Sequence, residues 1–458
     1  MDNLEPLLAR QLAGFEALKK CQQLTNGASQ ETYRVVAQTK TGERQLALRR
    51  CPPSQQASST VGQISLATEA QLVQLAHDAD IPTPEIIYVL QDSDGLGEGF
   101  LMQWLNGETR GQRIIRSEHL ASVRPMLARQ CGEILARLHA IDVSAELSEQ
   151  LPHVTSEGLV RETWDWYQSL KVPQPMIDFT ARWLLDHLPE QSRQTLVHGD
   201  FRNGNLMVDE RGVCAVLDWE LAQIGDPVRD LGWLCVNSWR FGHQELAVGG
   251  FGKVEDLLTA YESVSGLNVN RDDLRFWQVF GSFWWSAATL NMAATWRTGE
   301  TPSLERPVIG RRSSEAQMDC VNLIIPGEFT LPVEIEQNQG AQLPMPAELL
   351  EGVRHFLKHD IAGGDQHHFG FIAKVAANSL GIAQRELLYG ADLRTAENAR
   401  LRELFRDNSA DDLQWQLVNL LRSNFPLDSP SLAAHLRQTV AGQLWIDQPG
   451  YSAINPVE

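Results

Sequence analysis

The sequence predicts an α+β protein with a strand-rich N-terminal part, a larger helical part and an all-α region at the end. Three observations support this prediction. Strand-like runs separated by turn signals fill much of residues 24–50, and a second short hairpin pattern lies at 206–217. Helical periodicity dominates residues 117–188 and returns beyond residue 346.

The N-terminal part predicts a helix followed by a small sheet. Residues 1–18 alternate apolar and polar at helical spacing. The stretches LTNGASQETYRVVAQ and RQLALRR then predict two strands, with an Asn-Gly turn signal in the first. A helix is expected over 65–79, and IPTPEIIYVL and GFLMQWLNGET each predict a further strand.

The middle of the chain predicts a helical core. We expect Ser117 to be the N-cap of a long helical stretch, in which residues 134–141 carry an apolar stripe. Further helices are expected at 159–170 and 176–188. Residues 276–296 lack charges and are long enough to span a membrane, but polar residues recur through them, so we expect a buried core helix.

The C-terminal part predicts a linker and a helical region. Residues 326–346 contain several Pro and Gln residues without a regular period, which indicates a linker. Helices are then expected at 347–360, 368–380, 396–407, 410–424 and 431–445. Ser429 and Pro430 form an N-cap and N1 pair for the last of these helices.

Acidic and amide side chains recur around the hairpin within residues 196–230. Asp200 and Asn205 precede its first strand, and Asp218 directly follows its second strand. In phosphoryl transfer one Asp can accept the proton of an attacking hydroxyl group, while an Asn oxygen and another carboxylate can hold magnesium against the phosphates. Asp, Asn and Gly are also ordinary turn formers, but their joint spacing around apolar strands favours this chemistry.

The sequences HGDFRNGN and VLDWE at this hairpin resemble the signature of the aminoglycoside phosphotransferase and choline kinase-like family of small-molecule kinases. The resemblance covers about residues 24–325 and is nearest to the branch fused to acyl-CoA dehydrogenases. It implies a protein-kinase-like bilobal fold, with Asp200 as catalytic base and with Asn205 and Asp218 as magnesium ligands.

The resemblance also assigns the surroundings of the catalytic base. His198 would hold the catalytic loop, and Asp230 of the GDPVRDL segment would anchor it from below. We also place Arg202, within the loop, among the catalytic residues.

Nucleotide contacts are implied in the N-terminal part. The turn at 26–29 lies where the family has its phosphate-covering loop, so Gly27 and Ser29 are candidates. Arg49 of LALRR stands where the family usually has a lysine, and its planar fork can bind phosphate oxygens; a surface arginine on an edge strand is the alternative. Glu69 lies where the family offers a carboxylate to this basic residue.

The segment that joins the two lobes is expected to bind the adenine. The resemblance implies that the backbone from Gln103 to Leu105 hydrogen-bonds the adenine edge. These assignments predict an N-lobe at 1–105, a C-lobe with the catalytic loop at 106–325, a linker at 326–346 and a helical accessory domain at 347–458. That last domain resembles an uncharacterised helical domain that sometimes follows such kinases.

The expected activity is transfer of the γ-phosphoryl group of ATP, with Mg²⁺, to a hydroxyl group of a small molecule. DWE replaces the DFG of protein kinases and the usual activation segment is missing, so a protein substrate is not expected. The resemblance implies a hydroxyacyl-CoA-like acceptor. The alternatives are an aminoglycoside or other antibiotic kinase, and a nucleotide-binding pseudokinase whose helical tail binds a partner.

Composition limits the partners. The 458 residues carry a formal net charge of -19, which argues against non-specific nucleic-acid binding. Six scattered cysteines without a CxxC pair favour a reducing compartment, and the acidic N-terminus lacks the pattern of a signal peptide, so we expect a cytoplasmic protein without membrane partners. A homo-oligomer is compatible with the sequence.

Overall fold

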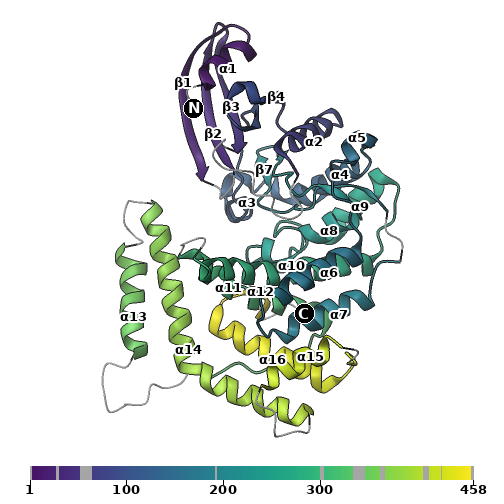
Figure 1. Ribbon diagram of the computed structural model, residues 1–458, viewed down its shortest axis with the longest axis vertical. Coiled ribbons are helices and arrows are strands. Elements are labelled where there is room, and N and C mark those ends of the chain that lie inside the picture. Colours follow the sequence, from purple (N-terminus) through teal and green to yellow (C-terminus); the bar gives the residue numbers. More distant parts are fainter. Residues whose placement is uncertain are drawn as a thin grey trace.

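The computed structural model describes residues 3–26, 30–51, 64–190, 193–299, 304–333, 346–361, 367–405, 412–423 and 425–454. A strand-rich lobe stands above a helical lobe, and the C-terminal helices pack along the side and the base of the latter (Figure 1). The α+β class, with a β-rich N-terminal part and a helical remainder, is therefore confirmed.

The N-lobe is an antiparallel five-stranded sheet in the order β1-β2-β3-β5-β4. Its elements are α1 (Leu4–Gln11), β1 (Phe15–Asn26), β2 (Glu31–Thr39), β3 (Gly42–Cys51), α2 (Leu66–Asp78), β4 (Ile86–Val89) and β5 (Glu98–Gln103), with a 3₁₀ turn at Asp92–Asp94. Side chains of β2 alternate between buried and half-buried, as expected for a sheet with one face on a core.

The helix expected over residues 1–18 is wrong beyond Gln11. The chain turns at Gly14, whose φ of +69° favours glycine, and then enters β1 at Phe15. Residues 15–26 pair with β2 along the edge of the sheet, and this tertiary pairing overrides the local helical pattern.

The C-lobe is mainly helical, with two small two-stranded sheets near the junction of the lobes. Its helices are α3 (Gly111–Arg116), α4 (Leu127–His139), α5 (Ala145–Ser148), α6 (Ser156–Ser169), α7 (Pro175–Asp186), α8 (Val228–Leu234), α9 (Val254–Ser265), α10 (Arg271–Arg297), α11 (Glu305–Arg311) and α12 (Ser313–Ile324). Its strands are β6 (Thr195–Val197), β7 (Leu206–Asp209), β8 (Gly212–Val216) and β9 (Gln223–Gly225), and 3₁₀ turns lie at Glu118–Leu120, Arg124–Met126 and Asn237–Trp239.

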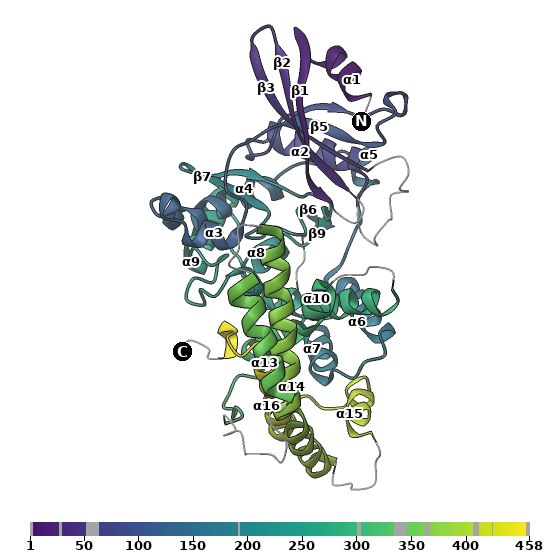
Figure 2. The same ribbon diagram turned by 90° about the vertical axis from the view of Figure 1, so that its left-hand side faces the viewer.

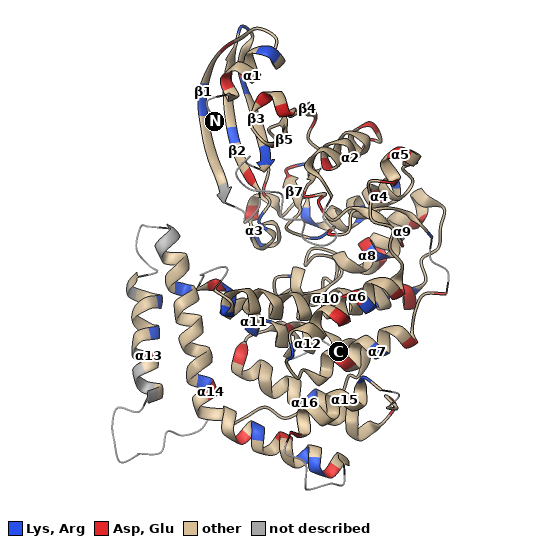
Figure 3. Ribbon diagram, in the orientation of Figure 1, with Lys and Arg blue, Asp and Glu red and all other residues tan. Residues whose placement is uncertain are grey.

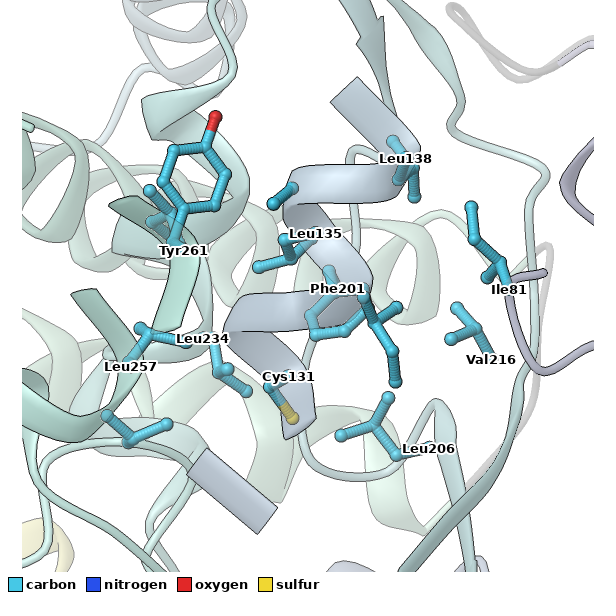
Figure 4. Close-up of a cluster of buried hydrophobic side chains, with 14 of the residues drawn as sticks. Ile81, Cys131, Leu135, Leu138, Phe201, Leu206, Val216, Leu234, Leu257 and Tyr261 are labelled. Carbon is cyan, nitrogen blue, oxygen red and sulfur yellow. The ribbon is translucent and has the colours of Figure 1, made fainter. Parts of the chain in front are cut away.

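Helix α4 passes through the middle of the core beneath the loop at 198–205, which joins β6 to β7. Figure 4 shows Cys131, Leu135 and Leu138 of this helix beside Phe201 of the loop and Leu206 of β7. All five side chains are buried. The predicted apolar stripe therefore supports the loop from below.

Ser117 does not cap a long helix. Its side chain makes no capping hydrogen bond, and two short 3₁₀ turns separate it from α4. Pro125 lies in the first positions of the second turn, where its missing N–H is tolerated.

Helix α10 is the predicted core helix. Its aromatic residues Phe276, Trp277, Phe280 and Phe283 are buried. Over the described part of the chain, no helix combines the length and the apolarity that crossing a membrane requires.

The C-terminal region is all-α. It consists of α13 (Pro346–Phe356), a π turn (Leu357–Ile361), α14 (His367–Phe405), α15 (Leu413–Leu421), α16 (Pro430–Asp447) and a 3₁₀ turn (Ser452–Ile454). Helices α13 and α14 pack against each other as a hairpin in both views (Figures 1 and 2). Ser429 caps α16 by accepting from the Leu432 N–H, as predicted.

One correction concerns α14. Two helices were expected at 368–380 and 396–407, whereas a single helix of 39 residues spans both. The sequence between them contains Gly381 and Gly390 but no proline, so nothing in it forces a break.

The C-terminal helices share a hydrophobic core with the C-lobe. A second large hydrophobic cluster, separate from the one around α4, joins Trp164, Phe280 and Met318 to Leu417 and Leu436. A buried ion pair adds to this contact, because Arg422 Nε lies 2.7 Å from Oδ1 of Asp178, which has no exposed area. The division at 326–346 predicted from composition therefore does not correspond to two separate cores.

Candidate active site

The catalytic loop leaves the small sheet β6–β9 and is fixed by Asp230. One carboxylate oxygen of Asp230 accepts the His198 N–H at 2.7 Å, and the other accepts the Gly199 N–H at 2.9 Å. His139 Nε2 lies 3.2 Å from the same carboxylate. Although burial opposes its ionisation, hydrogen bonds and nearby histidines lower the pKa of Asp230. Asp230 therefore stands where the resemblance implied an anchor.

His198 ties the loop to the following hairpin. Its Nε2 lies 3.1 Å from the Leu217 carbonyl oxygen, and its side chain is buried. Burial lowers the pKa of His198, so a neutral ring is favoured. A neutral ring with Nε2 as donor can bond the Leu217 carbonyl, which precedes Asp218 directly.

Asp200 lies near the start of this loop, and its carboxylate accepts hydrogen bonds from three side chains. Trp233 Nε1 lies 2.8 Å from Oδ1, Asn205 Nδ2 lies 2.6 Å from Oδ2, and Arg202 Nε lies within 3.1 Å of both oxygens. An ionised carboxylate offers about four acceptor positions. The donors thus fix the orientation of the Asp200 carboxylate.

Arg202, which we place among the catalytic residues, lies beside Asp200, and a tryptophan supports its guanidinium group. Its guanidinium carbon lies 4.8 Å from the centroid of the Trp239 ring, in cation–π distance. Trp233 and Trp239 were not predicted as site residues. Nothing in the sequence distinguishes a tryptophan that donates to Asp200 from one that only fills a core.

Asn205 and Asp218 lie on either side of the β7–β8 hairpin. The Leu217 N–H donates to the Asn205 carbonyl oxygen at 2.8 Å, which holds the two ends together. Because the Asn205 amide nitrogen donates to Asp200, its side-chain oxygen is the atom left for a cation. Asp218 has a φ of +66°, a left-handed conformation that is costly for a residue other than glycine and that often marks functional sites.

Arg49 reaches across from the N-lobe to this hairpin. Its Nη2 lies 2.9 Å from Asp218 and 3.0 Å from Glu220, and its Nε lies 3.3 Å from Glu69. Burial disfavours its charge, but the three carboxylates raise the pKa of Arg49 overall. Burial also raises the pKa of Glu69 to about 7, with Arg49 acting in the opposite direction. The predicted contact between Arg49 and Glu69 is thus present, and Glu220 is a partner that was not predicted.

The predicted adenine segment is partly bonded to the backbone of the N-lobe. The Gln103 N–H donates to the Glu85 carbonyl and the Trp104 N–H to the Gln45 carbonyl, whereas the Leu105 N–H has no backbone partner among the described residues. Gly27 and Ser29, the predicted phosphate contacts, lie outside the described residues.

A pocket of about 590 Å³ opens beside Asp200. Four tryptophans form much of its wall, namely Trp233, Trp239, Trp284 and Trp285. Its charged lining consists of Arg116, Arg202 and Arg312 against Asp200 and Glu315. The pocket therefore combines aromatic surface with a slight excess of positive charge.

The chain has a strand-rich lobe above a helical lobe, with acidic and amide side chains at their junction. These features are typical of kinase-like phosphotransferases. The model of the phosphotransferase enzyme family matches residues 20–267, more than half of the chain. The chain belongs to this family. A model of a domain of unknown function (DUF6285) matches residues 364–451, in agreement with the uncharacterised helical domain expected there.

The curated relatives include acyl-CoA dehydrogenase family members. Family member 10 of Mus musculus is 28% identical over 225 residues, covering 47% of this chain and 20% of that protein. Family member 11 of Pongo abelii is 24% identical over 399 residues, covering 78% and 48%. The chain thus spans between a fifth and about half of the length of these relatives.

A solved structure confirms the fold. The crystal structure of a Ralstonia eutropha protein, assigned provisionally by its name to the aminoglycoside phosphotransferases, matches with a TM-score of 0.56 at 20% identity. The match covers 70% of this chain and 96% of that one. The kinase-like bilobal fold predicted from the motif is therefore confirmed.

Proposed function

We propose that the protein is an ATP-dependent phosphotransferase that moves the γ-phosphoryl group to a hydroxyl group of a small molecule. The main support is the convergence of Asp200, Asn205 and Asp218 with the half-buried Arg49 at one junction. Beside this junction lies a pocket large enough for a small molecule. Family membership is consistent with this activity.

In the proposed reaction Asp200 is the general base. The acceptor O–H donates to the Asp200 carboxylate, its oxygen forms a bond to the γ-phosphorus, and the bond to the β-phosphate oxygen breaks, releasing ADP. Trp233, Arg202 and Asn205 hold the carboxylate in one orientation. Much of the rate enhancement of phosphoryl transfer comes from such positioning and from charge stabilisation.

Asn205 and Asp218 are the residues that would hold Mg²⁺. Both offer hard oxygen ligands, which suit this ion, and Asp218 is half exposed. Magnesium would neutralise the developing phosphate charge. Arg49, which contacts both Asp218 and Glu69, would supply a further positive charge beside the nucleotide phosphates.

The acceptor class that we favour is a hydroxyacyl-CoA or a similar metabolite. The pocket beside Asp200 has aromatic walls for an apolar chain and three arginines against two carboxylates. A polycationic aminoglycoside would instead require a wall rich in Asp and Glu. The names of the curated relatives, acyl-CoA dehydrogenase family members, support the same choice.

A screen for ADP release tests the activity. The full chain is incubated with ATP, Mg²⁺ and pools of hydroxylated metabolites, including hydroxyacyl-CoA thioesters and aminoglycosides, and products are identified by mass spectrometry. We expect phosphorylation in a hydroxyacyl thioester pool. Asp200→Asn should cut turnover by about a hundred- to ten-thousand-fold. Glu210→Gln, an exposed change in the β7–β8 turn, is the matched control.

The pseudokinase alternative makes a different prediction. An active enzyme should bind ATP more tightly with Mg²⁺, and this gain should be lost in Asp218→Ala. Calorimetric titrations with and without Mg²⁺ measure it. Equal ATP affinity in both titrations, with Asp218→Ala unchanged and no turnover in the screen, would support the pseudokinase.

A further inference from the structure

The pocket beside Asp200 is walled in part by the C-terminal end of the chain. Gln448, Gly450, Tyr451 and Ser452 line it together with C-lobe residues. These residues follow α16 and lie more than 200 positions from Asp200 in the sequence. The region with no assigned role therefore contributes directly to the space that an acceptor would occupy.

This wall is held firmly against the C-lobe. The Tyr451 hydroxyl group donates to Asp319 Oδ2 at 2.8 Å, and Asn237 Nδ2 donates to Asp319 Oδ1 at 2.8 Å. Asn322 Nδ2 donates to the Ala453 carbonyl at 2.9 Å, and Ala453 and Ile454 are buried. The segment is thus a fixed part of the pocket wall.

A second pocket of about 280 Å³ lies next to the first. Arg312, Glu315 and Gln448 line both pockets, so the two share a wall. The second pocket also meets Arg354 of α13 and Arg385 of α14. Figure 3 shows basic residues on α11 and on the α13–α14 hairpin, and α14 packs against α11.

The second pocket is richer in positive charge than in negative charge. Arg311, Arg312, Arg354 and Arg385 line it against only two carboxylates, Glu315 and Asp447. Arg385 donates to the backbone carbonyls of Ile446 and Asp447, and no carboxylate of the described residues lies within 4.0 Å of its nitrogens. Burial and the neighbouring arginines lower the pKa of Arg385, whereas Asp447 raises it. Arg311 is paired with Asp447 and Glu386, Arg312 with Glu315, and Arg354 with Glu351. Arg385 is therefore the cation of this pocket that is best suited to bind an anion.

We propose that the C-terminal segment and the α13–α14 hairpin form the distal half of the acceptor site. This half binds an anionic group of the acceptor, of the phosphate or carboxylate type, while the hydroxyl group of the same molecule lies at Asp200. The proposal rests on the proposed phosphotransferase function and adds to it a role for the C-terminal helices. It requires an acceptor long enough to extend from the aromatic pocket past Gln448.

Binding of a matched pair of probes tests this site. The probes are 3-hydroxydecanoyl-CoA and the neutral thioester of the same acid with N-acetylcysteamine. Both are titrated by calorimetry into the full chain with Mg²⁺ and a saturating non-hydrolysable ATP analogue, which blocks the nucleotide site. We expect the CoA thioester to bind at least tenfold more tightly than the neutral thioester.

Three variants locate the effect. Arg354→Ala removes a half-buried cation from the second pocket, and Gln448→Glu places a negative charge on the shared wall. Each should weaken the CoA thioester about tenfold and leave the neutral thioester unchanged. Arg402→Ala, an exposed change on α14 outside both pockets, should alter neither probe.

Each outcome decides one claim. Equal affinity for the two probes, or equal weakening of both probes by Arg354→Ala and Gln448→Glu, would overturn the anion site. If the probes behave as expected but no acceptor is ever phosphorylated, the phosphotransferase function fails while the anion site stands. If turnover depends on Asp200 but the KM of the acceptor is unchanged in Arg354→Ala and in Gln448→Glu, the distal site alone is wrong.

Discussion

Arg49 and Arg50 are adjacent in the sequence but have opposite surroundings. In a strand successive side chains point to opposite faces. Arg49 faces Glu69, Asp218 and Glu220 at the junction of the lobes. Arg50 instead lies against Glu31 at 2.9 Å and donates to the Leu96 carbonyl within the N-lobe. Only Arg49 is placed to act on a nucleotide bound between the lobes.

We predict that Arg49→Ala weakens ATP binding or turnover far more than Arg50→Ala does. The reason is that Arg49 supplies the cation nearest to Asp218, where the triphosphate charge must be offset. Arg49→Lys should keep partial activity, because the charge remains while the two-pronged contact is lost. Steady-state kinetics of the three variants at matched Mg²⁺ measures this order.

Stability must be separated from function in this comparison. Arg50 is almost fully buried, so Arg50→Ala can lower the folded fraction. Rates are therefore normalised to folded protein, determined by thermal unfolding. If Arg49→Ala kept the wild-type rate per folded protein while Arg50→Ala lost it, Arg49 would not be the residue that binds the nucleotide phosphates.

The sequence predicted those site residues that are fixed by local chain geometry. Asp200, Asn205 and Asp218 surround one hairpin, so their proximity follows from sequence spacing alone. Trp233 and Glu220 could not be identified in this way. Trp233 lies on α8 and contacts Asp200 only through tertiary packing. Glu220 has the sequence pattern of an ordinary surface carboxylate, and only the fold shows that it pairs with Arg49.

At the scale of elements, the C-terminal segment docks on α12 through one buried carboxyl group. Asp319 of α12 is 4% exposed and contacts Asn237 and Tyr451. Burial raises the pKa of Asp319 to about 7. Burial and the same carboxyl group also raise the pKa of Tyr451 well above its usual value, so both groups are favoured in their neutral forms.

We predict that this contact weakens as the pH rises. An unfolded Asp ionises near 3.8, whereas Asp319 in the folded protein keeps its proton up to about 7. The folded state therefore binds more protons in between, and the stability that this group contributes falls from about pH 4 to about pH 7. Asp319→Asn stays neutral throughout, so its Tm should rise relative to that of the wild type between pH 5 and pH 8.

Thermal unfolding at a series of pH values measures the difference between the two proteins. Comparing the variant with the wild type cancels the titration of all other groups. Asp428→Asn, on the loop before α16, is the control and should give a curve parallel to that of the wild type. If the curve of Tm against pH for Asp319→Asn also ran parallel to that of the wild type, Asp319 would be ionised in the folded protein.

The elements that the sequence predicted well are those with strong local signals. The β7–β8 hairpin and α16 both have turn or capping residues at their ends, and both lie within two residues of their predicted bounds. The N-terminal helix and the divided α14 were wrong in part. In each case the outcome depends on what packs alongside: β2 against residues 15–26, and α13 and α16 against α14.

At the scale of the whole molecule, the C-lobe and the C-terminal helices are joined by more than a linker. Arg437 of α16 donates to the carbonyls of Ile325, Pro326 and Glu328, which holds the start of the predicted linker. The Thr330 N–H donates to Gln438 at 2.9 Å. Composition alone predicted few contacts for this segment. Because residues 325–330 are held by these hydrogen bonds, we expect proteases not to cleave there. The remainder of the predicted linker, 334–345, lies outside the described residues.

The ion pair between Asp178 and Arg422 tests whether the two regions unfold together. Asp178 of α7 is fully buried and accepts from Trp164 at 2.7 Å and from Arg422, which follows α15. Removing Arg422 would leave Asp178 short of its only cationic partner among the described residues. Breaking a buried pair in this way costs about 3–5 kcal/mol, and 21% exposure of the Arg422 side chain places the expected cost toward the lower limit.

We predict that Arg422→Ala lowers the free energy of unfolding by about 3 kcal/mol. Arg161→Ala removes an exposed pair with Glu157 on α6 and should cost less than about 1 kcal/mol. Denaturant unfolding gives both values, and hydrogen exchange shows where protection is lost. Because the core is shared, exchange should accelerate in α6 and α7 as well as in α15 and α16. Faster exchange confined to the C-terminal helices would instead show that these helices open as an independent domain, as the composition of the linker first suggested.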